Sequence, residues 1–179
     1  MKRIDFAGLG MAVGFLVWMG CSTTPDQASN REAKARYEYN RIMREYRVPA
    51  EEATNEVERV AMLDQVAAAY LEFTQEYGDV PRWSAAALRS LGQVHLERGE
   101  FKEALASFEQ VGQRYPQEHW EVIQAWKEAA DMLWETRHRG EAVLYYRQMV
   151  DTYDRPGQPP MFETLVNIAR LRLNEQGAR

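Results

Sequence analysis

The three histidines and the single cysteine are the residues of this sequence best suited to bind a metal ion or to act as a nucleophile. Histidine and cysteine ligands of zinc recur at short, fixed spacings, and a nucleophilic cysteine needs a nearby basic group that lowers its pKa. His95, His119 and His138 lie on separate segments, and none has a second histidine four residues away or a cysteine close by. We therefore expect no metal site, and we expect His95 to pack in the interior.

Sequence patterns typical of enzymes are also missing. The chain has no P-loop, no G-x-S-x-G turn and no H-E-x-x-H pair. The glycines of residues 8–14 (GLGMAVG) follow no strand and lack an acidic residue at the distance that a dinucleotide site requires. Glu51 and Glu52 suit the start of a helix, where carboxylates interact favourably with the helix dipole. We expect a non-catalytic protein without a cofactor.

The overall charge argues against nucleic acid as a main partner. The chain has 22 Lys and Arg against 27 Asp and Glu, for a net charge of −5, and no segment concentrates the basic residues. Its 179 residues, 45% of them hydrophobic, suit one folded domain.

Cys21 follows a segment with the features of an export signal. Lys2 and Arg3 precede the apolar residues 6–19, a run of signal-peptide length that is shorter than the roughly 20 residues needed to span a bilayer. Gly20 then comes directly before the cysteine. This arrangement resembles the lipobox of bacterial lipoproteins, in which the cysteine is acylated on sulfur and becomes the new N-terminus.

The lipobox resemblance implies a membrane anchor. It implies that residues 1–20 are a signal peptide and that residues 21–30 are the lipidated cysteine and a flexible tether. Ser22 resembles the sorting pattern for the outer membrane, which implies a protein on its periplasmic face. Trp18 stands where lipoboxes usually have leucine. The alternative is an uncleaved signal segment that anchors the chain in the inner membrane.

Aromatic and apolar residues recur in the chain with a period of 38 residues. Four sets share this spacing: Tyr77, Tyr115 and Tyr153; Tyr70, Phe108 and Tyr146; Val66, Ala104 and Ala142; and Phe73, Val111 and Met149. Within the unit, apolar residues follow helical spacing on two segments separated by Arg98-Gly99-Glu100, and by His138-Arg139-Gly140 in the next copy. No strand-like alternation is present, so we predict an all-α fold of helical hairpins.

The repeat resembles the tetratricopeptide repeat (TPR), whose pattern is W-x2-L-G-x2-Y, A-x3-F and P over about 34 residues. In residues 88–116 (LRSLGQVHLERGEFKEALASFEQVGQRYP) its positions hold Leu88, Leu91, Gly92, His95, Ala104, Phe108 and Pro116. In the next copy they hold Trp126, Ala129, Ala130, Leu133, Ala142, Tyr146 and Asp154. The resemblance implies a short right-handed α-solenoid with small residues, such as Gly92, where paired helices approach most closely.

The remaining segments are expected to complete the solenoid, to about seven helices in all. We expect a first helix at 27–47, ended by Val48-Pro49, and a second at 51–77. Residues 31–81 would then form the N-terminal helices and a degenerate first repeat, residues 82–118 and 119–154 two full repeats, and residues 155–179 a loop and a capping helix.

The TPR resemblance implies a partner-binding groove on the inner faces of the first helices. By position, this groove presents Arg89, Gln93, Leu96, Glu97, Lys127, Asp131, Trp134 and Glu135. Their mixed charges would suit an extended peptide or a helix, with Trp134 as an exposed anchor. Alternatively, the final helix covers Trp134 and the charges are only solvated. The family's carboxylate clamp, which needs Asn and several Lys or Arg, is not met.

The longer unit resembles the repeats of bacterial cell-envelope proteins, among them the lipoprotein of the outer-membrane β-barrel assembly machine. This implies a scaffold lipoprotein that binds envelope proteins through the groove and the membrane through Cys21. The alternatives are a structural subunit anchored in the inner membrane, a secretin pilotin and a periplasmic partner of the Tol system.

Overall fold

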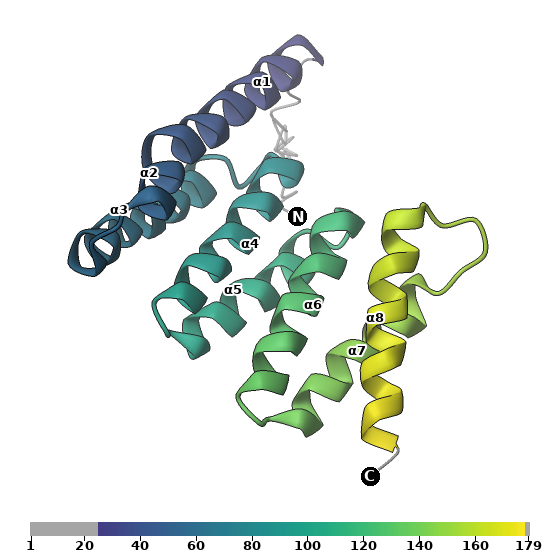
Figure 1. Cartoon of the computed structure of the whole chain (residues 1–179). Helices are drawn as coiled ribbons and strands as arrows, with labels where there is room; N and C mark the ends of the chain where they lie inside the picture. Colours follow the sequence, from purple (N-terminus) through teal and green to yellow (C-terminus); the bar gives the residue numbers. More distant parts are fainter. Residues whose placement is uncertain (1–24, 178–179) are drawn as a thin grey trace, which may run out of the picture.

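The computed structural model describes residues 25–177, which form helices and no strand (Figure 1). The elements are α1 (Pro25–Ile42), the π-helix η1 (Met43–Arg47), α2 (Val48–Glu52), α3 (Glu56–Glu76), α4 (Pro81–Glu97), α5 (Phe101–Arg114), α6 (His119–Glu135), α7 (Arg139–Tyr153) and α8 (Pro160–Gly177). Because α1, η1 and α2 are continuous, the described chain has seven helical segments. The prediction of an all-α fold is confirmed. None of the described helices is both long and apolar enough to cross a membrane.

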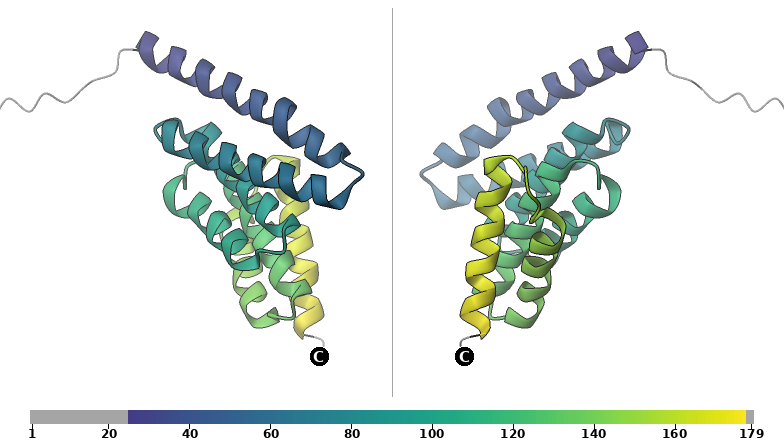
Figure 2. Two further views of the ribbon diagram at one scale, coloured as in Figure 1. Left: turned by 90° about the vertical axis from the view of Figure 1, so that its left-hand side faces the viewer. Right: turned by 90° about the vertical axis from the view of Figure 1, so that its right-hand side faces the viewer.

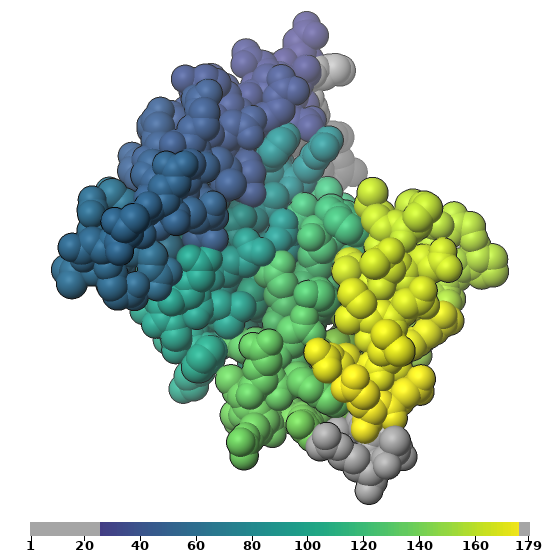
Figure 3. Space-filling model, viewed as in Figure 1, coloured from purple at the N-terminus to yellow at the C-terminus, as the bar shows by residue number. Residues whose placement is uncertain are grey.

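The helices pack as a stack of neighbouring antiparallel pairs, which is a solenoid-like arrangement. Along the stack, α4 contacts both α1 and α6, and α6 contacts α8, whereas the backbones of α3, α5 and α7 do not approach one another. We call α1, α4, α6 and α8 the first helices, because each of them begins a new layer of the stack. Figures 1 and 3 view the molecule from the side of these first helices, with α4, α6 and α8 in front. We call this side the inner face. Since the first helices form a continuous row, a partner that binds there can contact several hairpins.

Helix α4 joins two hydrophobic clusters. Ala87, Leu91 and Val94 belong to the cluster formed with α1 and α3, and Ala85 and Leu88 to the cluster formed with α5 to α8. Buried aromatic side chains fill both clusters: Tyr70 in the first, and Phe108 and Tyr146 in the second. The 38-residue spacing of these three aromatics therefore marks equivalent core positions.

The two ends of the stack are closed by α1 and α8 (Figure 2). Helix α8 packs on α6 and α7 and buries Phe162, Val166 and Ala169. Its outward side exposes mostly polar residues, namely Glu163, Thr164, Asn167, Arg170, Asn174 and Glu175, together with the apolar Met161 and Leu171. A largely polar outer side is what the terminal unit of a repeat stack needs, because no further unit covers it.

The N-terminal helices begin and end at different residues from those predicted from the sequence. The predicted break at Val48-Pro49 is wrong, because η1 follows α1 without a gap and α2 continues the helix through these residues to Glu52. The Val48 N–H donates to Met43 O across the wider π turn, and Pro49 follows directly after this turn, in the first turn of α2. Residues 25–30 are helical, whereas we expected them to be part of a flexible tether.

Helix α3 begins five residues later than predicted. Ala53 and Asn55 have extended backbones, and the Asn55 side chain accepts hydrogen bonds from the N–H groups of Val57 (2.9 Å) and Glu58 (3.4 Å). This N-cap satisfies two N–H groups that have no partner within the helix.

The turns inside the hairpins use the same geometry with different residues. Gly99 has φ +74° at the end of α4, as the predicted stop requires. After α6 the equivalent residue is Arg137, with φ 68°, and Gly140 lies inside α7. The predicted turn at His138-Arg139-Gly140 therefore lies too far along the chain, because α7 already begins at Arg139.

Candidate partner-binding surface

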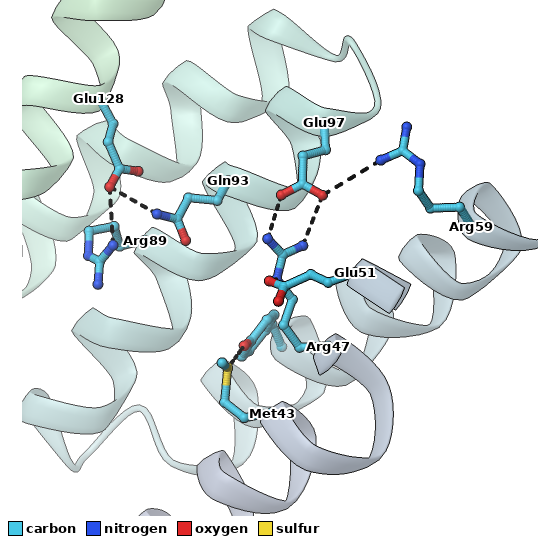
Figure 4. A network of polar contacts seen from close by, with 9 residues as sticks. Met43, Arg47, Glu51, Arg59, Arg89, Gln93, Glu97 and Glu128 are labelled. Carbon is cyan, nitrogen blue, oxygen red and sulfur yellow. Dashed lines mark hydrogen bonds and ion pairs between the residues drawn. The ribbon is translucent and has the colours of Figure 1, made fainter. Parts of the chain in front are cut away.

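Arg89 and Gln93 connect α4 to α6 through a network that is largely removed from solvent (Figure 4). Arg89 donates from Nε to Glu121 Oε2 (2.7 Å) and from Nη1 to Glu128 Oε1 (3.1 Å). Gln93 Nε2 donates to the same Glu128 oxygen at 3.0 Å. The side chains of Arg89, Glu121 and Glu128 are only 16%, 16% and 17% exposed. These two predicted groove residues therefore hold neighbouring hairpins together.

Glu97 connects α4 to the N-terminal helices in a similar way. Arg47 of η1 donates from Nη1 to Glu97 Oε2 (3.0 Å), and Arg59 of α3 lies 3.9 Å from the same oxygen. Arg47 also pairs with Glu51 at 2.8 Å (Figure 4). Arg89, Gln93 and Glu97 thus form one stripe along α4, and each of them pairs with a side chain on an adjacent helix.

On α6, two more predicted groove residues have partners within the fold. Lys127 Nζ lies 2.7 Å from Asp131 Oδ2, and Tyr146 donates its hydroxyl hydrogen to Asp131 Oδ1 at 2.6 Å. Burial, followed by the nearby Asp131 carboxylate, raises the pKa of Tyr146, so this hydroxyl stays a donor.

Trp134 is half-buried and packs at the junction of α6, α7 and α8. Its ring stands edge-on to Tyr146, with ring centres 6.1 Å apart. The guanidinium carbons of Arg139 and Arg172 lie 5.0 Å and 5.4 Å from the centre of the Trp134 ring. Since Arg172 belongs to α8, the final helix contributes to covering Trp134, as the alternative interpretation of the sequence described.

Glu135 lies at an open pocket, which we call the inner-face pocket. This pocket has a volume of about 480 Å³ and lies between the ends of α4 and α6 and the start of α5. Its lining residues are Leu96, Phe101, Glu128, Asp131, Met132, Glu135 and Thr136. Of the predicted groove residues, the structure therefore brings Leu96, Asp131 and Glu135 together here.

The carboxylate of Glu128 is incompletely satisfied. Oε1 accepts hydrogen bonds from both Arg89 and Gln93, whereas Oε2 is buried and has no hydrogen-bond partner among the described residues. Burial raises the pKa of Glu128, against the opposing effect of Arg89. The wall of the pocket therefore holds a carboxylate that its neighbours compensate only in part.

A second opening lies between α5 and α7, and we call it the outer crevice. Its volume is about 410 Å³, and its lining residues are Glu109, Gly112, Gln113, Trp126, Leu144, Tyr145 and Gln148. Leu144 is 62% exposed, and Tyr145 donates a hydrogen bond to Glu109 across the crevice at 2.6 Å. Sequence reasoning placed Trp126 in the repeat pattern but did not identify this opening.

Each of the three histidines contacts a different residue. His95 Nδ1 lies 2.6 Å from Glu100 Oε2, His138 Nδ1 lies 3.1 Å from Thr136 Oγ1, and the His119 ring stacks edge-on against Tyr153. His95 is half-buried rather than enclosed in the core. Across residues 25–177, no group of three or more His, Cys, Asp or Glu is arranged to hold a metal ion. Cys21 lies outside the described residues.

Sequence reasoning did not identify four of the residues that line the inner-face pocket, namely Phe101, Glu128, Met132 and Thr136. Phe101 directly follows the turn at 98–100 and begins α5, so it lies outside the first helices that were searched for a groove. Glu128 is one residue from Lys127, and only the packing of α4 on α6 turns it toward Arg89.

The chain was compared with protein-family models, with curated proteins and with solved structures, and none of the three comparisons gave a match. The arguments for function therefore rest on the residues of this chain.

Proposed function

We propose that this protein is a non-catalytic helical scaffold that binds another cell-envelope protein through its inner face. The observation that carries the proposal is the inner-face pocket. Most polar groups along this face pair with each other, but the pocket between α4 and α6 stays open, with Phe101 half-exposed and carboxylates around it. An open pocket on a row of helices suits the insertion of a partner side chain.

The resemblance to TPR proteins supports a binding role over a catalytic one. Proteins of this kind present a surface formed by successive helices, and a few side chains on it select the partner. The described titratable side chains of the inner face act mainly as ion-pair and hydrogen-bond partners between helices.

The second part of the proposal is an anchor in the outer membrane, with the scaffold facing the periplasm. It rests on the sequence around Cys21, where a basic start, an apolar segment and glycine precede the cysteine. Acylation of Cys21 would hold the scaffold at the membrane, since two or more acyl chains give stable attachment. The competing possibility is an uncleaved signal anchor in the inner membrane, which Trp18 favours.

Mass spectrometry of the protein purified from membranes distinguishes the two anchors. We expect the mature chain to begin at Cys21, with a mass increase from acyl chains on that residue. A Cys21→Ser variant should keep its signal segment and lose the added mass. Recovery of an unmodified chain that begins at Met1 would refute the lipid anchor.

Site-specific crosslinking in intact cells tests the inner face. A photoreactive residue in place of Glu135 should capture one defined envelope protein, whose identity decides between an assembly machine, a secretin complex and the Tol system. The matched position is Leu144, which is exposed in the outer crevice. Capture from Leu144 but not from Glu135 would place the partner on the other side of the stack and contradict the proposal.

A further inference from the structure

We infer that the inner-face pocket receives a partner segment in which a bulky apolar residue lies beside a lysine or an arginine. This inference rests on the proposed scaffold function and adds the chemistry of the partner to it. It follows from the apolar wall, from the charges around the pocket and from the way these two features adjoin.

The apolar wall of the pocket is formed by Leu96, Phe101 and Met132. Phe101 is 50% exposed although it begins a well-packed helix. Burying an exposed aromatic ring against an apolar partner side chain is favourable, and aromatic residues in such positions often dominate binding. The wall therefore favours a bulky apolar group.

All the charged residues that line the inner-face pocket are acidic. Three of the lining residues are carboxylates, namely Glu128, Asp131 and Glu135, and none is Lys, Arg or His. Glu128 and Asp131 already have cationic neighbours within the fold, whereas Glu135 has no ion-pair partner among the described residues. An anionic partner would be repelled here, and a neutral one would desolvate the carboxylates without compensation.

A lysine or arginine side chain matches both features at once. Its methylene stem can lie along Phe101 and Leu96 while its charged head reaches the carboxylates. It would also place a positive charge near Glu128, whose Oε2 has no partner among the described residues. A free metal ion would leave the apolar wall uncovered, so the pocket fits a side chain better than an ion.

Binding of labelled synthetic peptides to the full-length, detergent-solubilised protein tests the inference by fluorescence anisotropy. One peptide carries leucine and lysine at helical spacing, a second replaces every lysine with glutamate, and a third replaces every leucine with glycine. We expect the leucine–lysine peptide to bind and both other peptides to bind at least about tenfold more weakly.

Two variants of the pocket should weaken that binding. Glu135→Lys should weaken it about tenfold through charge, and Phe101→Ala should weaken it by a similar factor through loss of the apolar wall. Asp151→Lys makes the same charge change on the exposed side of α7, and Leu144→Ala changes the outer crevice. Both controls should leave the affinity unchanged, and thermal melts check that every variant is folded.

Each other outcome overturns the inference in a distinct way. Equal weakening by Glu135→Lys and Asp151→Lys would mean that the peptide senses only overall charge. Weakening by Leu144→Ala alone would place the site in the outer crevice. If no peptide binds but a photoreactive residue at position 135 still captures an envelope protein, then the scaffold function stands and the proposed partner chemistry is wrong.

Discussion

Replacing Arg89 with methionine should lower the free energy of unfolding by about 3 kcal/mol, because breaking a buried ion pair leaves uncompensated charge in the interior. Two carboxylates lose their main cation at once: Glu121, 2.7 Å from Arg89, and Glu128, 3.1 Å from it. Both side chains are more than four-fifths buried. Urea denaturation at pH 7.5, with the wild-type protein as reference, measures the difference.

The pH dependence of this effect has a defined sign. Burial already raises the pKa of Glu128, and removal of Arg89 should raise it further. A carboxyl group whose pKa is higher in the folded state than in the unfolded chain destabilises the fold as the pH rises through the folded-state pKa. The deficit of Arg89→Met should therefore shrink as the pH is lowered from 7.5 toward the ordinary pKa of glutamate.

A triple variant provides the control for Arg89. Changing Glu121 and Glu128 to glutamine together with Arg89→Met removes the stranded charges and should recover most of the loss, since neutral replacement of a buried ion pair is often tolerated. A loss below about 1 kcal/mol in the single variant, or no recovery in the triple variant, would show that the network contributes little to joining α4 and α6.

Gly92→Ala should lower the free energy of unfolding by about 2 kcal/mol, because the added methyl group collides with Phe108. A Cβ at position 92 would lie 2.7 Å from Phe108 Cδ1 and 2.9 Å from Cζ, and Phe108 is fully buried. Overpacking of this kind costs about 3 kcal/mol, against which alanine gains about 1 kcal/mol in helix propensity. Thermal and urea denaturation give the net value.

Gly140→Ala is the matched control for Gly92. A Cβ at Gly140 has no neighbour within 4 Å, so the same change should stabilise α7 slightly. In addition, Phe108→Leu should cost less in the Gly92→Ala background than in the wild type, with a coupling of at least about 1 kcal/mol. Additive effects of the two substitutions would contradict a direct clash.

The repeat core could be predicted from the sequence because it depends on local spacing. The 38-residue period aligns Tyr70, Phe108 and Tyr146, and all three are fully buried. Gly92 was predicted to lie at a close helix contact, and the Phe108 ring occupies the space that a side chain would need. Such positions are constrained by size and periodicity, which are visible in one sequence.

The N-terminal helices and the inner face could not be predicted in the same way. Proline usually marks a break, but at Pro49 a π turn provides the geometry that lets the helix continue. Arg137 adopts the left-handed backbone that glycine adopts at position 99, and its side chain gives no sign of this.

Arg89 and Glu128 are 39 residues apart, and their pairing depends on how two helices pack. Which inner-face charges are free and which are paired is therefore a property of the tertiary structure. Glu135 and Glu97 look alike in the sequence, yet only Glu97 is held by arginines from other helices.

The start of α1 at Pro25 limits how far an anchored protein could reach. Only four peptide steps separate Cys21 from Pro25, which is about 14 Å of chain even when fully extended. If Cys21 carries acyl chains and the protein faces the periplasm, as proposed, then the N-terminal end of the stack stays beside the lipid headgroups and cannot explore the width of the periplasm. The scaffold would then meet only partners that are themselves close to the membrane, at a high local concentration and in a restricted orientation.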